Sequence, residues 1–175
     1  MDFSLRPATA ADAEAIMVMH LQSHEETYGR QLPESFFAMR RRTLPARVER
    51  LRNTMFREHI PMLAYDGGGL VGVAGAGPAR DADAPVPLEL HWIYTLARVH
   101  GSGAGQLLLD AVVGEKAACL WVLEDNPRAQ AFYARNGFAL DGERKLMPPE
   151  WSSLPEVRMV RPEACAAPAS ATLAG

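Results

Sequence analysis

The sequence predicts an α/β (α+β) fold in which about seven strands form a single mixed, mostly antiparallel sheet flanked by helices. Short apolar runs typical of strands alternate with longer segments that carry helix start and stop signals. A glycine turn at residues 66–69 joins two such runs as a hairpin. Two further apolar runs lead, through a glycine-rich turn and an Asn-Pro pair, directly into helices.

The first half of the chain contains a strand, three helical segments and the hairpin. Thr9 followed by Asp12 resembles a capping box and begins the first helix, and Pro45 is better placed to begin a helix than to continue one. The expected elements are a strand at 2–7, helices at 9–28, 33–37 and 45–56, and strands at 61–65 and 70–76. Small residues share one face of the last strand and predict close packing there: Gly72, Ala74 and Ala76.

The second half begins with a polar loop and contains four strands and two helices. One helix has complete end signals, because Asn126 suits the N-cap, Pro127 the first turn and Gly137 the position after the C-cap. The expected elements are a loop at 80–87, a strand at 88–96, a glycine-rich turn at 101–105 with a helix to about 117, a strand at 118–123, a helix at 126–136, and strands at 138–146 and 157–160.

Length and composition predict one domain at residues 1–161 followed by an Ala/Pro-rich, disordered tail at 162–175. The net charge of −3 argues against a nucleic-acid partner. With no apolar run of about 18 residues, no membrane association is expected. Cys119 and Cys165 stand in neither a disulfide framework nor a metal-ligand spacing, so we expect a cytoplasmic protein without metal.

The glycine-rich turn at 101–105 comes between a strand and an apolar helix. Backbone N–H groups at such a helix start lack intrahelical partners and favour an anion, which predicts a phosphate or pyrophosphate site. A dinucleotide fingerprint fails because Gln106 and Leu108 occupy the positions that require glycine, which argues against a nucleotide-dependent oxidoreductase. A P-loop fails as well, because Gly105 is not followed by Lys. A tight turn without any ligand is the alternative.

Two segments together resemble the GCN5-related N-acetyltransferase (GNAT) superfamily. The family motif Gln/Arg-x-x-Gly-x-Gly/Ala is similar to residues 100–105, where Gly103 and Gly105 match and His100 departs. The second motif is a strand, an Asn and a helix that carries Phe-Tyr and ends in Gly-Phe. It is matched by residues 120–123, Asn126, Phe132, Tyr133, Gly137 and Phe138.

This resemblance implies a GNAT-like acyl-CoA N-acyltransferase fold at 1–161, with acetyl-CoA as the acetyl-donor cosubstrate between strands 88–96 and 118–123. The pantetheine arm would pair with the first strand, the pyrophosphate would lie on the glycine-rich turn, and Asn126 would contact the arm. The implied cofactor-binding residues are Ile93, Tyr94, Thr95, His100, Gly101, Ser102, Gly103, Ala104, Gly105, Gln106, Asn126 and Tyr133.

For catalysis, the resemblance assigns proton donation to Tyr133, which lies two helical turns after Asn126 and can face the same cleft. Alternation along residues 88–95 predicts one apolar face, made of Leu88, Leu90, Trp92 and Tyr94. Glu89 and His91 then lie on the other face as alternative general bases, with Glu124 a weaker candidate. A backbone N–H near residues 93–95 would hold the oxyanion.

The family's acceptor pocket corresponds here to residues 147–154, His20, His24, Glu25 and Tyr28. A zinc motif fails because Tyr28 stands where a second His belongs. The arginines between 40 and 57 form either an anion site or a solvated face. The predicted activity is direct acetyl transfer, in a ternary complex, to a primary amine of a small molecule or peptide. A non-catalytic acyl-CoA sensor is the alternative, and a homodimer stays open.

Overall fold

The computed structural model describes residues 2–58 and 60–163, without the side chains of 55–58. The predicted tail therefore lies outside the described residues from position 164 onward. The strands are β1 (Ser4–Pro7), β2 (Met62–Asp66), β3 (Gly69–Pro78), β4 (Leu88–Thr95), β5 (Ala118–Leu123), β6 (Ala139–Leu146) and β7 (Pro155–Arg161). The α-helices are α1 (Ala13–Tyr28), α2 (Glu34–Arg42), α3 (Leu44–Glu58), α4 (Ala104–Val112) and α5 (Pro127–Arg135).

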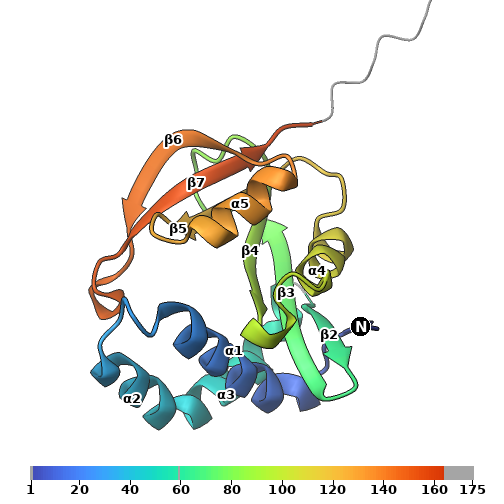
Figure 1. The fold of residues 1–175 in the computed structure, drawn as a ribbon, viewed down its shortest axis with the longest axis vertical. Coiled ribbons are helices and arrows are strands. Elements are labelled where there is room, and N and C mark those ends of the chain that lie inside the picture. The colour runs from blue at the N-terminus through green and yellow to red at the C-terminus, as the bar shows by residue number, and fades with distance from the viewer. Residues whose placement is uncertain (1, 59, 164–175) are drawn as a thin grey trace, which may run out of the picture.

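The seven strands form one sheet in the order β1-β2-β3-β4-β5-β7-β6. Every neighbouring pair is antiparallel except β4 and β5, which run parallel. The predicted mixed, mostly antiparallel sheet flanked by helices is confirmed. Figure 1 shows α1, α2 and α3 gathered at one end of the molecule and α5 with β6 and β7 at the other, with β4 running between them.

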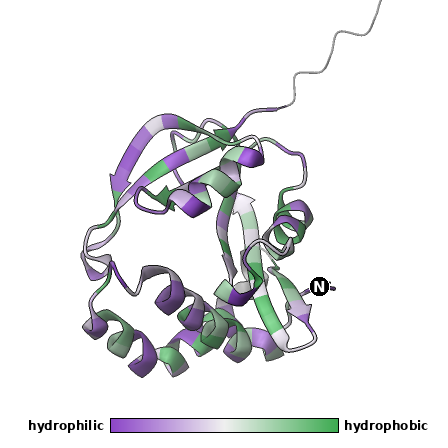
Figure 2. Ribbon diagram, viewed as in Figure 1, coloured by the Kyte–Doolittle hydropathy of each residue, from purple (hydrophilic) through white to green (hydrophobic). Residues whose placement is uncertain are grey.

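Two layers of apolar side chains hold helices on opposite faces of the sheet. On one face, Ile16 of α1 and Val48 of α3 pack with Leu63 and Val73 of the sheet. On the other face, Leu108 of α4 packs with Ala64, Val71 and Ala74. Figure 2 shows hydrophobic residues along β3 and a hydrophilic β6, which forms one edge of the sheet.

Close packing explains the small residues of β3. A Cβ atom added at Gly72 would lie 2.7 Å from Leu108 Cδ1 and 3.2 Å from the Tyr94 carbonyl oxygen. Since contacts this short do not occur between packed carbon atoms, only glycine lets α4 and β4 approach β3 here. The expectation of close packing at this face is confirmed.

The helix ends follow the predicted signals, with differences in length. The Thr9 N–H donates to Asp12 Oδ2 at 2.7 Å, which confirms the capping interaction, and a short 3₁₀ turn at Ala10–Asp12 precedes α1. Helix α4 ends at Val112 and not near residue 117, because Gly114 adopts a left-handed φ of 58° that turns the chain. Within 2–58 and 60–163, no helix has the length and apolarity needed to cross a membrane.

The predicted apolar face of β4 is wrong. Ala76 lies opposite Leu90 and Gly75 opposite Trp92, so the register shifts at His91 as in a β-bulge. Leu88 and Leu90 therefore pack toward α4 and α5, whereas Trp92 and Tyr94 pack toward α1. Simple alternation does not survive a bulge, because the additional residue exchanges the two faces of the strand beyond it.

Candidate active site

The cleft of the molecule opens where β4 and β5 separate. The two parallel strands are paired only at Glu89 with Cys119 and at Leu90 with Leu120. Beyond these pairs β4 stays bonded to β3 on its other edge, and β5 to β7. The edge of β4 that faces β5 is consequently open along residues 92–95, and a cavity of about 920 Å³ fills the space.

The glycine-rich turn closes one end of this cleft. Gly101 and Gly103 have φ values of 76° and 99°, and Gly103 is the N-cap of α4. No heavy atom lies within 4 Å of a Cβ added at either glycine, so the backbone of the turn is open to a ligand. The N–H groups of residues 104–106 start the helix, and among described residues they have no backbone acceptor. These donors form an anion-binding turn.

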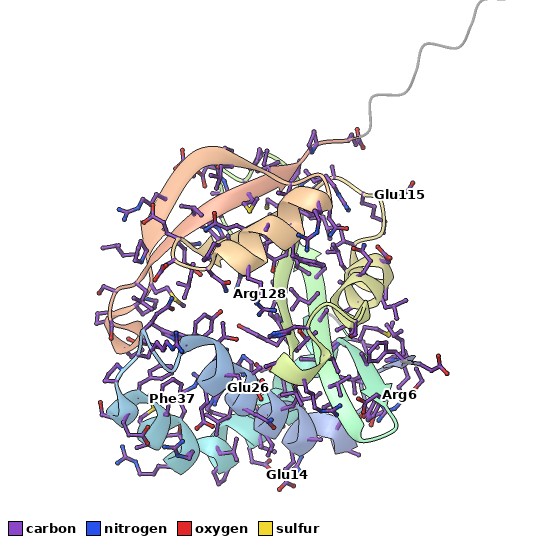
Figure 3. All side chains as sticks on the ribbon, viewed as in Figure 1. Arg6, Glu14, Glu26, Phe37, Glu115 and Arg128 are labelled. Atoms are coloured by element: carbon purple, nitrogen blue, oxygen red, sulfur yellow. The ribbon has the colours of Figure 1, made fainter. Side chains whose placement is uncertain are left out.

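His100 does not supply a positive charge to this turn. Its Nε2 lies 3.3 Å from the Thr95 carbonyl oxygen, and burial, followed by the charge of Arg128, lowers the pKa of His100. The imidazole is therefore neutral at pH 7. Arg128, in the first turn of α5, lines the same cleft and forms no ion pair with another described residue. Its guanidinium points toward the space between α5 and α1 (Figure 3).

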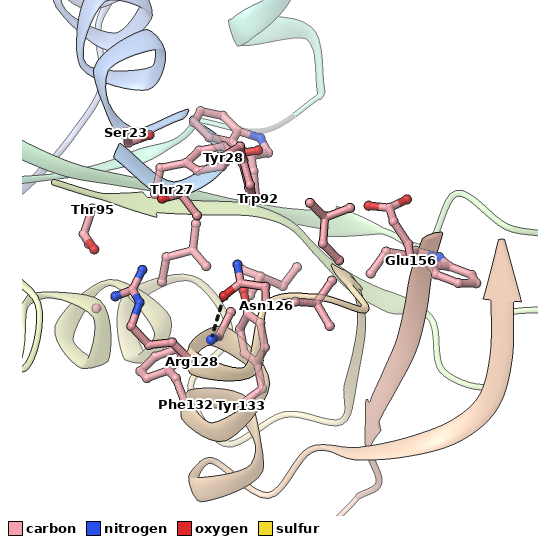
Figure 4. Close-up of a pocket in the computed structure, with 18 of the residues that line it drawn as sticks. Ser23, Thr27, Tyr28, Trp92, Thr95, Asn126, Arg128, Phe132, Tyr133 and Glu156 are labelled. Atoms are coloured by element: carbon pink, nitrogen blue, oxygen red, sulfur yellow. Dashed lines mark hydrogen bonds between the residues drawn. The ribbon is translucent and has the colours of Figure 1, made fainter. Parts of the chain in front are cut away.

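Asn126 and Tyr133 stand on the cleft side of α5. The Asn126 side chain accepts a hydrogen bond from the Ala129 N–H at 3.1 Å, so the predicted N-cap is confirmed. Tyr133 packs edge-on against Phe132 and Phe138, and its ring borders the cavity (Figure 4). Burial, and then the neighbouring Tyr28, raises the pKa of Tyr133 above the ordinary tyrosine value of 10.0. The phenol is therefore protonated at neutral pH.

The structure separates the three base candidates. His91 borders the cleft, and its Nε2 lies 3.0 Å from the Pro78 carbonyl oxygen. Glu89 does not border it: only 1% of this residue is exposed, and its carboxylate accepts the Arg80 N–H at 2.9 Å and forms an ion pair with the Arg80 guanidinium. Glu124 pairs with Arg144 at 2.8 Å, away from the cavity lining.

Most of the predicted cofactor-binding residues lie together around the cleft. Those that line it are Ile93, Tyr94, Thr95, His100, Gly101, Gly103, Gly105, Gln106, Asn126 and Tyr133. Ser102 and Ala104 do not: the Ser102 hydroxyl donates to the Val99 carbonyl at 2.6 Å, and the Ala104 side chain is part of the core. They can still contribute backbone N–H groups.

The predicted acceptor residues separate into a pocket wall and a buried cluster. Tyr28 and Trp151 line the cleft. Behind them the rings of His20 and His24 are in tilted contact with centroids 4.0 Å apart, and both contact Tyr94. Burial, and then the charge of Arg47, lowers the pKa of His20 to about 3, and burial lowers that of His24 as well. These imidazoles are neutral packing residues with hydrogen-bonding capacity.

The arginines of α2 and α3 divide between two environments. Arg41 pairs with Glu25 and Glu34, as expected of a solvated face. Arg40 lies over the ring of Trp151 at 5.1 Å, and its Nη2 is 3.4 Å from His24 Nδ1. Arg47 Nη2 is likewise 3.2 Å from His20 Nδ1. Neither of the two predictions for the arginines between 40 and 57, an anion site or a solvated face, describes all of these residues.

Sequence reasoning missed the charged residues that line the cleft, Arg128 and Glu156 among them. Arg128 directly follows the Asn-Pro pair, and a cation at that position on the cleft side of α5 could have been noticed. Glu156 lies on β7, opposite Leu123 of β5, and its carboxylate borders the cavity. It was missed because the last strand was expected to begin at Val157, whereas β7 begins at Pro155.

Together, the fold and the site define a class of proteins in which a cleft between two diverging parallel strands ends at a glycine-rich, anion-binding turn. Residues 57–140 match the family model described as an acetyltransferase (GNAT) domain. Proteins named as uncharacterized N-acetyltransferases of Mycobacterium tuberculosis and Mycobacterium bovis are 35% identical over 89 residues, which are 47% of this chain and 54% of theirs. The chain thus matches about half the length of these relatives.

Solved structures extend the similarity over the whole fold. The PaiA N-acetyltransferase of Thermoplasma acidophilum, in complex with coenzyme A, has a TM-score of 0.68 at 18% identity over 93% of this chain and 99% of that one. A Corynebacterium glutamicum structure described as histone acetyltransferase HPA2 and related acetyltransferase has a TM-score of 0.68 at 25% identity over 95% and 99%. By the family model over residues 57–140 and by these structures, this chain is similar to members of the GCN5-related N-acetyltransferase superfamily.

Proposed function

We propose that the protein is an acetyl-CoA-dependent N-acetyltransferase that acts on a primary amine of a small molecule or peptide. The observation that carries the proposal is the cleft itself: an open edge of β4, an anion-binding turn and the Tyr133 ring border one cavity. The relatives named N-acetyltransferases support the same activity. So does a Salmonella typhimurium neighbour, described as yncA with its cofactor acetyl-CoA, at a TM-score of 0.64 and 16% identity over 97% of this chain and 99% of that one.

The residues present fit acetyl-CoA. The open backbone edge at 92–95 has the hydrogen-bonding groups that a pantetheine amide needs, and the glycine turn presents N–H groups without Cβ atoms in front of them. Arg128 supplies the positive charge that His100 lacks. When bound, acetyl-CoA supplies a thioester with a transferable acetyl group and a thiolate leaving group.

In this proposal Tyr133 donates its Oη proton to the leaving sulfur. The raised pKa keeps the phenol protonated until the thiolate forms. A backbone N–H of residues 93–95 stabilises the developing negative charge on the carbonyl oxygen, since this edge of β4 faces the cleft. The amine attacks directly, with both substrates bound.

Among the base candidates from the sequence, His91 keeps a place at the cleft, whereas the Glu89 carboxylate is engaged by Arg80. Part of the proposal is also a cytoplasmic setting, which is consistent with the buried free thiol of Cys119. A second copy of the chain would pair along the exposed edge strand β6.

The test is release of free thiol from acetyl-CoA across a panel of primary amines, with mass-spectrometric detection of the acetylated product. The proposal expects thiol release that depends on the amine, and Tyr133→Phe should lower turnover about 100-fold or more while coenzyme A still binds. Thermal stabilisation by acetyl-CoA without turnover on any amine would instead favour an acyl-CoA sensor.

A further inference from the structure

The cleft contains one carboxylate that the proposed mechanism has not used. Glu156 is half-buried and borders the cavity, on the side opposite Thr95 and Arg128 (Figure 4). No other Asp or Glu in the described part of the chain lines this cavity. Because it lies opposite Thr95 and Arg128, Glu156 marks the end of the cleft away from these residues.

The Glu156 carboxylate has no ion-pair partner among the described residues, although cations lie close. Lys145 is opposite Glu156 in the strand register, but its ammonium lies 3.4 Å from Asp81 and 3.8 Å from the centre of the Trp121 ring. Arg80 is engaged by Glu89. Both nearby cations thus have other anionic partners, and the negative charge of Glu156 is left for a ligand.

Aromatic and apolar side chains surround this end of the cleft. Its walls include Tyr28, Trp92, Tyr94, Trp151 and Met147. Burial and then the charge of Glu156 raise the pKa of Tyr28, and Tyr28 in turn contributes to the raised pKa of Tyr133. Glu156, Tyr28 and Tyr133 line one cavity.

We propose that Glu156 binds the ammonium group of an acceptor that carries a single positive charge on an apolar body, and that its carboxylate removes the ammonium proton. This inference rests on the proposed acetyltransferase function. One carboxylate matches one ammonium, whereas Arg128 and Arg135, which have no ion pair with another described residue, also line the cavity and repel additional positive charges. The apolar walls match an aromatic or aliphatic body rather than a polyamine chain.

Two protons leave the nitrogen during the reaction, and one reaches the sulfur. An N–H bond of the ammonium breaks and its proton moves to Glu156 Oε, directly or through a water molecule. The neutral amine forms the C–N bond, the C–S bond breaks, and the Tyr133 proton moves to sulfur. The second nitrogen proton restores Tyr133, and the proton on Glu156 leaves to solvent, so that one ammonium and one thioester give one amide, one thiol and one proton.

The surroundings of Glu156 suit a proton acceptor. Burial raises its pKa, and Glu89 and Asp81 act in the same direction, while Lys145 and Arg80 act against it. The charge of Glu156 also acts on Tyr28 and Tyr94, and the pKa of both is raised, chiefly by burial, so both phenols remain neutral. A carboxylate with a raised pKa is a better base than an exposed one.

The experiment measures kcat/KM for phenethylamine and for spermidine between pH 7 and 9, with the full chain and acetyl-CoA. We compare the wild type, Glu156→Gln and the matched control Glu124→Gln, which changes a carboxylate outside the cleft. The wild type should prefer phenethylamine by about 10-fold or more, and Glu156→Gln should lose about 100-fold at pH 7. Glu124→Gln should behave as the wild type, and coenzyme A affinity should be equal in all three.

The pH slope separates a proton acceptor from a residue that only shapes the pocket. With Glu156 present, the bound ammonium reacts and kcat/KM should change little across this range. In Glu156→Gln only the free amine in solution reacts, so kcat/KM should rise about tenfold per pH unit below the amine pKa. Glu156→Asp, which keeps a titratable carboxylate, should keep the level profile at a lower rate.

Three results would overturn the inference. If the wild type is active and the Glu156→Gln variant keeps both its rate and its level pH profile, Glu156 is not the proton acceptor, and the proposed acetyltransferase function still stands. A preference for spermidine removes the acceptor class. A wild type that acetylates no amine overturns the proposed function, and this inference with it.

Discussion

The buried imidazole of His24 makes the free energy of unfolding depend on pH. Only 1% of this residue is exposed, it contacts the rings of His20, Tyr94 and Trp151, and its Nε2 has no hydrogen-bond partner among the described residues. Burial, and then the proximity of His20, lowers the pKa of His24 below the 6.5 of an exposed imidazole. Between these two values the unfolded chain binds a proton that the folded chain does not.

The free energy of unfolding must therefore fall as the pH falls below about 6.5, the unfolded value. The stability is fully present above that pH and is lost progressively toward the low folded pKa. A shift of one pKa unit corresponds to about 1.4 kcal/mol, so one imidazole that stays neutral costs about 2 kcal/mol between pH 7 and pH 5. His20, whose folded pKa is about 3, adds a similar loss.

The measurement is urea unfolding at pH 5, 6 and 7, followed by the fluorescence of the three tryptophans. His24→Phe retains a ring at this position but does not titrate. Its loss of stability between pH 7 and pH 5 should be smaller than that of the wild type by about 2 kcal/mol. Each protein is compared with itself at pH 7, so the change in packing does not enter. Equal pH slopes for both proteins would refute the reasoning.

Two predictions concern the anion-binding end of the cleft. Gly103→Ala should destabilise the fold by about 1–2 kcal/mol, because the φ of 99° at this position is strained for any residue with a Cβ. Thermal unfolding measures the loss. Gly105 has no such φ, so the control Gly105→Ala should keep the unfolding midpoint of the wild type. Arg128→Gln should weaken acetyl-CoA binding, because it removes the electrostatic attraction between the guanidinium and the phosphate groups. The difference in affinity from the wild type should shrink as salt is raised from 50 to about 500 mM. Calorimetric titration with acetyl-CoA measures the affinities of the wild type and of Arg128→Gln, and Arg42→Gln, at an exposed position, is the control. Equal affinities of the wild type and Arg128→Gln at low salt would show that Arg128 does not contact the cofactor.

Local signals in the sequence predicted the elements that position the cofactor end of the cleft. Asn126 caps α5 and Gly103 adopts a left-handed φ because each requirement is local, set by the residue and its immediate neighbours. The order of elements follows from the local patterns, and the family resemblance implied a cofactor site between the strands that are β4 and β5. These parts of the fold need no knowledge of distant contacts.

The acceptor end could not be predicted in the same way. The bulge at His91 exchanges the faces of β4, and no residue of the strand predicts this bulge. The burial of Glu89 depends on Arg80, whose backbone N–H and guanidinium reach the carboxylate across a loop. Glu156 enters the cleft because β7 inserts between β5 and β6, which is a property of the sheet order and not of the local sequence.

The central claim is that the acetyl donor and the amine meet in the cleft between β4 and β5 and react directly. Initial rates of thiol release, measured over a matrix of acetyl-CoA and amine concentrations, test it most directly. We expect double-reciprocal lines that intersect, because both substrates are bound before the acetyl group moves. Parallel lines would contradict it, since they indicate that the acetyl group first resides on a side chain of the protein.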